Sequence, residues 1–196
     1  MRGRLIYLMG PSGAGKDSLI AAAKTELDQR GIRVARRIIT RSGKTHGEDA
    51  RIVTADIFKR MAESGEFVMH WYANDMGYGI DVEIENWLCD GQHVLVNGSR
   101  AYFSEALERW PEMLTVLLAV DASILAKRLL ARGRETEEQI RNRLLRNDRL
   151  QGGGAIETAT CKRIETLDNS GELSVTLATM SLLLDHHGFN VIADRI

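Results

Sequence analysis

The sequence has little of several features that mark special classes of protein. Its 196 residues include only two cysteines, Cys89 and Cys161, which stand far apart with no C-x-x-C or Cys/His spacing. This pattern predicts neither a disulfide framework nor a zinc site, and it favours a reducing compartment. No apolar run is long enough for a membrane span, and the one near the N-terminus is too short for a signal-peptide core. We therefore expect a cytoplasmic protein with no membrane partner.

An excess of charge of one sign is also missing. The formal net charge is -1, so the overall balance gives no reason to expect a nucleic acid partner. Local charge is uneven, because residues 33–44 hold five basic side chains and no acidic one, and residues 127–149 hold eight basic against four acidic. Both patches are candidates for anion binding. The length and the 44% hydrophobic content favour a single domain over residues 1–196.

Short apolar runs alternate with helical patterns along the chain. We predict strands at residues 5–9, 34–39, 67–72, 93–96 and 113–120. Helices are predicted at residues 16–29, 54–63, 81–89, 104–110 and 122–131, with one opened by Thr136 and a last one ending near Asp185. This alternation predicts an α/β sandwich with a mainly parallel central sheet and helices on both faces.

The first predicted strand leads into the sequence GPSGAGKDS. The pattern G-x-x-x-x-G-K between a strand and a helix is typical of a phosphate-binding loop (P-loop), in which backbone amides and the helix start face phosphate oxygens. The alternative is a plain glycine turn. Lys16 is predicted to reach the β and γ phosphates of ATP. The candidate nucleotide-binding residues of this loop are Gly10, Pro11, Ser12, Gly13, Ala14, Gly15, Lys16, Asp17 and Ser18.

Asp17 stands where this loop usually has a serine or threonine that holds Mg²⁺. A carboxylate beside a bound triphosphate is repelled unless a cation lies between them. We therefore predict that Asp17 is the metal-binding residue and that the cofactors are ATP and Mg²⁺, with Ser18 as a weaker candidate. The alternative is an acidic residue at the helix start that points away from the site.

The two basic patches predict an anionic acceptor. A phosphate acceptor is already charged and needs no carboxylate base, whereas its transfer needs positive charge to stabilise the transition state. The first patch lies in a predicted acceptor-binding segment at about 36–80, and the second lies in a predicted arginine-rich lid at about 128–146. A solvated surface is the alternative for any single arginine. Asn169, in the turn sequence TLDNSGEL, is a candidate contact for the nucleotide base.

The order of these motifs resembles the guanylate-kinase-like branch of the nucleoside monophosphate kinases over nearly the whole chain. The shared elements include GPSGAGK, Thr40-Arg41, GEFVMHW, Tyr78-Gly79 and RLLARGRETEEQIRNRL. The chain departs from guanylate kinases at Asp17, at His70 in place of a guanine-reading acid, and at Ile80 in place of a hydroxyl residue. The base-reading groups are therefore missing.

Those departures resemble a second family of the same fold, the ribose 1,5-bisphosphate phosphokinases, through GPSGAGKDS, RIITR, HWYAN and VLVNGSR. The resemblance implies transfer of phosphate from ATP to ribose 1,5-bisphosphate, a small sugar phosphate, to give 5-phosphoribosyl 1-diphosphate during phosphonate breakdown. It also implies that Lys16 neutralises the transferring phosphoryl group and that Arg132 and Arg143 close from the lid.

The resemblance further suggests which residues hold the acceptor. The candidates for its two phosphates are Arg37, Arg41, Tyr78 and Arg100, and the candidates for its ribose hydroxyls are Asn97 and Ser99.

Three other functions compete with this one. An ordinary guanylate or other nucleoside monophosphate kinase is supported by Arg41, Glu48 and Tyr78. A non-catalytic interaction module of the same fold is disfavoured by the intact loop, and a regulatory GTPase by the lack of an N-K-x-D element. The sequence leaves the oligomeric state open.

Overall fold

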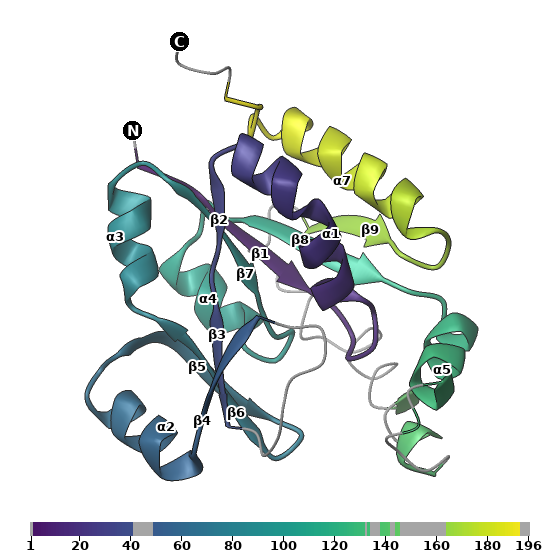
Figure 1. Cartoon of the computed structure of the whole chain (residues 1–196), viewed down its shortest axis with the longest axis horizontal. Coiled ribbons are helices and arrows are strands. Elements are labelled where there is room, and N and C mark those ends of the chain that lie inside the picture. Colours follow the sequence, from purple (N-terminus) through teal and green to yellow (C-terminus); the bar gives the residue numbers. More distant parts are fainter. Residues whose placement is uncertain are drawn as a thin grey trace.

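A five-stranded parallel sheet forms the centre of the protein. The computed structural model describes residues 2–40, 49–131, 133, 138–141, 144–145 and 164–192. The sheet has the order β2-β7-β1-β8-β9, and every neighbouring pair is parallel (Figure 1). Its strands are β1 (Leu5–Met9), β2 (Ile32–Val34), β7 (His93–Asn97), β8 (Leu114–Ala119) and β9 (Ile164–Asp168).

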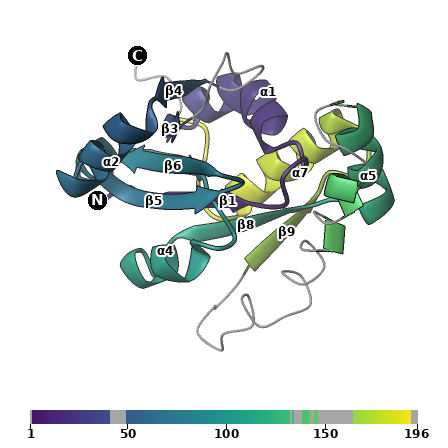
Figure 2. The same ribbon diagram turned by 90° about the horizontal axis from the view of Figure 1, so that it is seen from below.

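Helices cover both faces of this sheet because its strands are apolar on both sides. On one face, Ile6 and Leu8 of β1 pack in a core with α1 (Lys16–Gln29), α5 (Ala122–Ala131) and α7 (Leu173–His186). On the other face, Leu5, Tyr7 and Met9 pack with α3 (Glu83–Cys89) and α4 (Phe103–Arg109). Figure 2 shows α1 and α7 on one side of β8 and α4 on the other. The predicted α/β sandwich is therefore confirmed.

A second, four-stranded sheet lies beside the first and is covered by one helix. Its order is β4-β3-β6-β5, with β3 and β4 parallel and the other pairs antiparallel. The strands are β3 (Arg37–Thr40), β4 (Ala50–Val53), β5 (Phe67–Ala73) and β6 (Met76–Asp81). Helix α2 (Ala55–Glu63) begins after Thr54, whose side chain caps it by accepting from the backbone amide of Ile57, and packs on the sheet through Phe58 and Met61. This sheet contains most of the predicted acceptor-binding segment.

The structure corrects the predicted strand at residues 34–39. The chain instead forms β2 and β3, which belong to different sheets, with a break at Ala35 and Arg36. Strands β4, β6 and β9 were not predicted. The helix predicted from Thr136 starts outside the described residues. Across the part of the chain that the structure describes, no helix has the length and apolarity that a membrane crossing requires.

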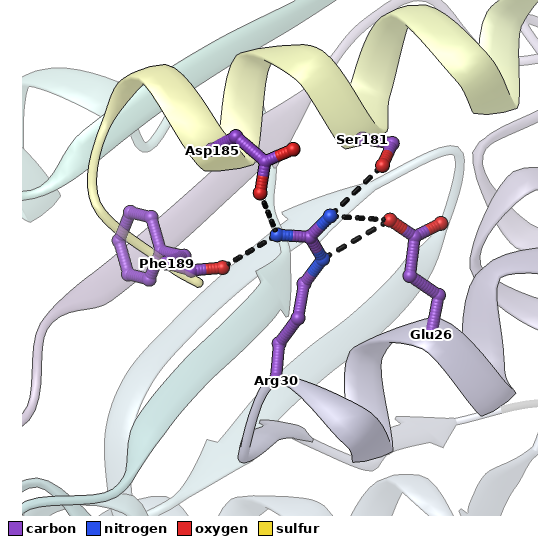
Figure 3. A network of polar contacts seen from close by, with 5 residues as sticks. All are labelled: Glu26, Arg30, Ser181, Asp185 and Phe189. Atoms are coloured by element: carbon purple, nitrogen blue, oxygen red, sulfur yellow. Dashed lines mark hydrogen bonds and ion pairs between the residues drawn. The ribbon is translucent and has the colours of Figure 1, made fainter. Parts of the chain in front are cut away.

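A buried arginine joins the end of α1 to α7. The side chain of Arg30 is only 3% exposed, and its guanidinium donates to Glu26, Asp185, Ser181 and the carbonyl of Phe189 (Figure 3). The hydrogen bond from Arg30 lowers the pKa of the Asp185 carboxyl. This part of the stabilisation is therefore present at neutral pH and is lost as the pH falls through the lowered pKa.

We expect Arg30→Met to lower the free energy of unfolding by about 2 kcal/mol, because it leaves two carboxylates and a buried carbonyl without their donor. Thermal and urea unfolding at neutral pH measure this loss. The control Lys24→Met removes an exposed pair with Asp28 on the same helix and should change the free energy by less than about 0.5 kcal/mol. Equal effects of the two substitutions would contradict the assigned role of Arg30.

Candidate active site

The candidate site lies at the carboxyl ends of β1 and β7. These two strands are neighbours, yet β1 leads into α1 on one face of the sheet and β7 leads into α4 on the other. The chain thus leaves two adjacent parallel strands in opposite directions, and ligands of α/β proteins bind at such switch points. The sequence motifs GPSGAGK and VLVNGSR both lie at this switch point.

The phosphate loop has the backbone that its glycines allow. Gly13 and Gly15 adopt left-handed conformations, with φ of 96° and 95°, which residues with a Cβ rarely adopt. Helix α1 starts directly at Lys16, so its first amides face the loop. The Lys16 ammonium donates to the carbonyls of Gly10 and Pro11, at 3.0 and 3.2 Å. The loop is therefore folded around the place where phosphates would bind.

Two side chains hold this loop from the α5 and α7 side. The Asn169 amide donates to the carbonyl of Ala14 at 2.7 Å and accepts from the hydroxyl of Thr176 at 3.0 Å. Asn169 is 3% exposed, and a Cβ on Gly15 would lie 2.6 Å from its amide nitrogen. Arg128 also donates to the carbonyl of Ala14, at 3.4 Å. Asn169 thus supports the loop, and its predicted contact with a nucleotide base stays a prediction.

Asp17 connects three parts of the site through one oxygen atom. Its Oδ1 accepts from Nδ2 of Asn97 on β7 at 2.6 Å and from Nη2 of Arg37 on β3 at 3.1 Å. The Asp17 side chain is 42% exposed and that of Arg37 is 12% exposed. The Asp17 carboxylate therefore lies between the carboxyl end of β7 and the second sheet. The alternative in which Asp17 points away from the site does not fit this geometry.

The segment after β7, residues 97–100, is fixed by Tyr7. The Tyr7 hydroxyl donates to the carbonyl of Ser99 at 2.8 Å and accepts from its amide at 3.0 Å. Burial raises the pKa of Tyr7, so the hydroxyl stays protonated. A Cβ on Gly98 would lie 2.2 Å from the Tyr7 ring, so glycine is required for this approach. The segment is held rigidly beside the phosphate loop.

One face of the second sheet forms an aromatic wall next to Arg37. The Arg37 guanidinium lies 5.4 Å from the centre of the Tyr78 ring, which stacks on Trp71 with centroids 5.7 Å apart. The cross-strand neighbours on this face are Met69 and Ile80, both fully buried and apolar. His70 pairs with Gly79, so it lies on the opposite face, where its ring is 6.2 Å from Phe67.

The structure thus brings Asp17, Arg37, Tyr78 and Asn97 together through direct contacts, and Lys16 directly precedes Asp17 in the chain. Ser99 and Arg100 follow Asn97 in the same rigid segment. Ser18 lies on α1 and is exposed. Arg41, Arg132 and Arg143, and much of the predicted lid, lie outside the described residues.

Sequence reasoning missed Tyr7 and did not assign Arg128 to the phosphate loop. Tyr7 belongs to an otherwise aliphatic strand and gives no sequence signal of its role. Arg128 is one of several basic residues in the predicted lid, and nothing in the sequence around it links it to the phosphate loop.

A solved structure shares the fold of this chain. Guanylate kinase from Anaplasma phagocytophilum aligns with a TM-score of 0.65 at 18% identity, covering 96% of this chain and 88% of that one. At this identity the likeness shows the fold alone, which is that of a guanylate-kinase-like P-loop kinase. No protein-family model matches the chain.

Curated relatives identify the family within that class. The ribose 1,5-bisphosphate phosphokinase PhnN of Pseudomonas paraeruginosa is 50% identical over 180 residues, which cover 92% of this chain and 94% of the relative. The protein of the same name from Pseudomonas fluorescens is 47% identical over 191 residues, covering 95% of this chain and 97% of that relative. The chain belongs to the ribose 1,5-bisphosphate phosphokinase family, which confirms the resemblance seen in its sequence.

We expect Tyr7→Phe to loosen residues 97–100, because it removes one of the two donors to the Ser99 carbonyl and takes away the acceptor of the Ser99 amide. The KM for the phosphoryl acceptor should rise about fivefold and the free energy of unfolding should fall by about 1 kcal/mol. Steady-state kinetics and thermal unfolding measure both. The control Tyr72→Phe removes a hydroxyl from a side chain that is 68% exposed and should change neither. An unchanged KM in Tyr7→Phe would show that the segment does not need this anchor.

Proposed function

We propose that this protein transfers the γ-phosphoryl group of ATP to ribose 1,5-bisphosphate and so makes 5-phosphoribosyl 1-diphosphate. The observation that carries this proposal is the 50% identity to a ribose 1,5-bisphosphate phosphokinase over nearly the full length of both chains. The associated process is phosphonate breakdown, and the proposed location is the cytoplasm.

The face of the second sheet supports an acceptor without a base. Arg37 and Tyr78 are suited to a phosphate, through charge and through the phenol hydroxyl. His70, which stands in place of a guanine-reading acid, lies on the other face of the strand. A site that recognises a purine needs hydrogen-bonding groups at its edge. A sugar phosphate has no base and does not need such groups, so it fits this face better than GMP.

ATP fits the phosphate loop of this structure. The left-handed glycines leave backbone amides free to turn toward phosphates, and the Lys16 ammonium lies across the loop, where it donates to the carbonyls of Gly10 and Pro11. Lys16 neutralises charge on the group in transfer. The acceptor phosphate is anionic already, so no residue of the site has to remove a proton from it.

Asp17 is the residue proposed to hold Mg²⁺. Oδ1 of Asp17 is occupied by Arg37 and Asn97, whereas Oδ2 receives no hydrogen bond from the residues that the structure describes. Mg²⁺ in phosphoryl-transfer sites takes one or two carboxylates together with substrate phosphates and water, which a single free oxygen fits. When bound, the ion supplies positive charge between Asp17 and the triphosphate.

The remaining predicted residues complete the proposal. Arg41 serves the acceptor phosphate, and Arg132 and Arg143 close over the transferring group from a lid at about 128–146. Arg100, Asn97 and Ser99 hold the rest of the acceptor. The whole chain acts as one domain.

The acceptor assay tests the proposal directly. The purified protein with ATP and magnesium should release ADP with ribose 1,5-bisphosphate and at least about 100-fold more slowly with GMP, since a missing set of base contacts costs several kcal/mol. ADP release is measured by a coupled assay, and the sugar product by phosphorus NMR. Turnover with GMP alone would mean that the protein is a nucleoside monophosphate kinase and that Asp17 is a tolerated variation.

The Asp17→Asn variant tests the metal role. We expect turnover to fall and the magnesium concentration for half-maximal rate to rise by about tenfold, because the amide binds a hard cation more weakly than the carboxylate. A magnesium titration at saturating ATP measures this shift. The control Asp28→Asn changes an exposed acid on the same helix. A magnesium dependence that is the same in Asp17→Asn and the wild type would remove Asp17 from the metal site.

A further inference from the structure

Two shielded polar atoms in the segment after β7 have no hydrogen-bond partner among the described residues. They are Oδ1 of Asn97 and Nη1 of Arg100. Asn97 is only 4% exposed, and its amide orientation is fixed because Nδ2 must face the Asp17 carboxylate. Oδ1 therefore points away from Asp17 and needs a donor. Buried polar atoms are normally paired, so each such atom requires an explanation.

Within the described part of the chain, Arg100 also lacks a carboxylate that would balance its charge. It takes part in no ion pair within the described residues, and burial lowers the pKa of its guanidinium. Arg109, the last residue of α4, is different, since it donates to Glu85 at 2.6 Å and to the carbonyl of Val68 at 3.2 Å. A partly buried guanidinium without an anion is unfavourable unless a ligand supplies the anion. Phosphate is the anion whose geometry suits a guanidinium best.

The two arginines of the site belong to different elements, Arg37 to β3 and Arg100 to the segment after β7. Arg37 contacts Asp17, which directly follows Lys16, so it lies where the reacting phosphate has to come. From Arg37 the aromatic wall continues through Tyr78 and Trp71 to Tyr102, whose ring is 5.8 Å from Trp71. The amide of Tyr102 donates to the carbonyl of Ser99, which places the backbone of Arg100 at this far end of the wall.

The geometry points to Arg100 as the residue that binds the non-reacting phosphate of the acceptor, at C5 of the ribose, while Arg37 binds the reacting phosphate at C1. Asn97 contacts Asp17, which pairs with Arg37, and it precedes Arg100 by three residues. Its Oδ1 accepts a hydrogen bond from a ribose hydroxyl. This assignment rests on the proposed function. Arg100 is then the residue that makes the enzyme select a bisphosphate, because an acceptor without the second phosphate leaves its guanidinium unpaired.

Half-substrates separate the two phosphate sites. Ribose 5-phosphate carries only the non-reacting phosphate and ribose 1-phosphate only the reacting one, and the binding of each is measured by calorimetry with ADP and magnesium present. In Arg100→Gln, ribose 5-phosphate should bind about 30-fold more weakly and ribose 1-phosphate within about threefold of the wild type, as expected for one charge-assisted contact. Arg37→Gln should give the reverse pattern.

Two controls keep the result interpretable. Arg109→Gln removes a nearby arginine of α4 that already has protein partners and should leave both affinities unchanged. Arg100→Lys keeps the charge, so it should recover part of the affinity for ribose 5-phosphate, and it replaces Arg100→Gln if that variant does not fold.

Equal weakening of both half-substrates in the Arg100 variants, or a loss confined to ribose 1-phosphate, would overturn the assignment. Failure of the proposed function is a separate result, namely that the wild type does not turn over ribose 1,5-bisphosphate.

Discussion

The rest of the site depends on the two hydrogen bonds that one oxygen of Asp17 accepts. Asn97 ends a strand of the central sheet, Arg37 begins a strand of the second sheet, and Asp17 is the second residue of the helix that follows the phosphate loop. One carboxylate oxygen thus fixes three segments that are far apart in sequence. Positioning is most of what an enzyme contributes to phosphoryl transfer, so under the proposed function this junction holds the acceptor-binding face in register with the loop.

The junction works because its supports are themselves rigid. Helix α1 is held at its start by the loop, which Asn169 fixes through Ala14, and at its end by Arg30, which ties it to α7. Tyr7 fixes the segment that follows Asn97. Side chains of this kind set the geometry of the site residues that they support. Residues on both faces of the central sheet therefore hold the phosphate loop and the segment after β7 in place.

Much of the fold was predictable from the sequence, since β1, α1, β7 and β8 combine strong apolar patterns with clear ends. The strand expected at residues 34–39 was wrong because the change of sheet at Ala35 and Arg36 leaves no mark on the apolar pattern. Strand β6 contains two glycines and β9 two acidic residues, so neither resembles a buried strand. Asp17, Arg37 and Asn97 were each predicted as site residues, but their mutual contact depends on how the two sheets lie together, which local patterns do not contain.

A double-mutant cycle on Asp17→Asn and Arg37→Gln tests most directly whether this junction aligns the loop with the acceptor face. The measured quantity is kcat/KM for the acceptor at saturating ATP and magnesium. The account predicts a coupling free energy of at least about 1.5 kcal/mol, so that the second substitution costs much less once the first is present. Losses that simply add, within about 0.5 kcal/mol, would contradict it, because the two residues would then act independently.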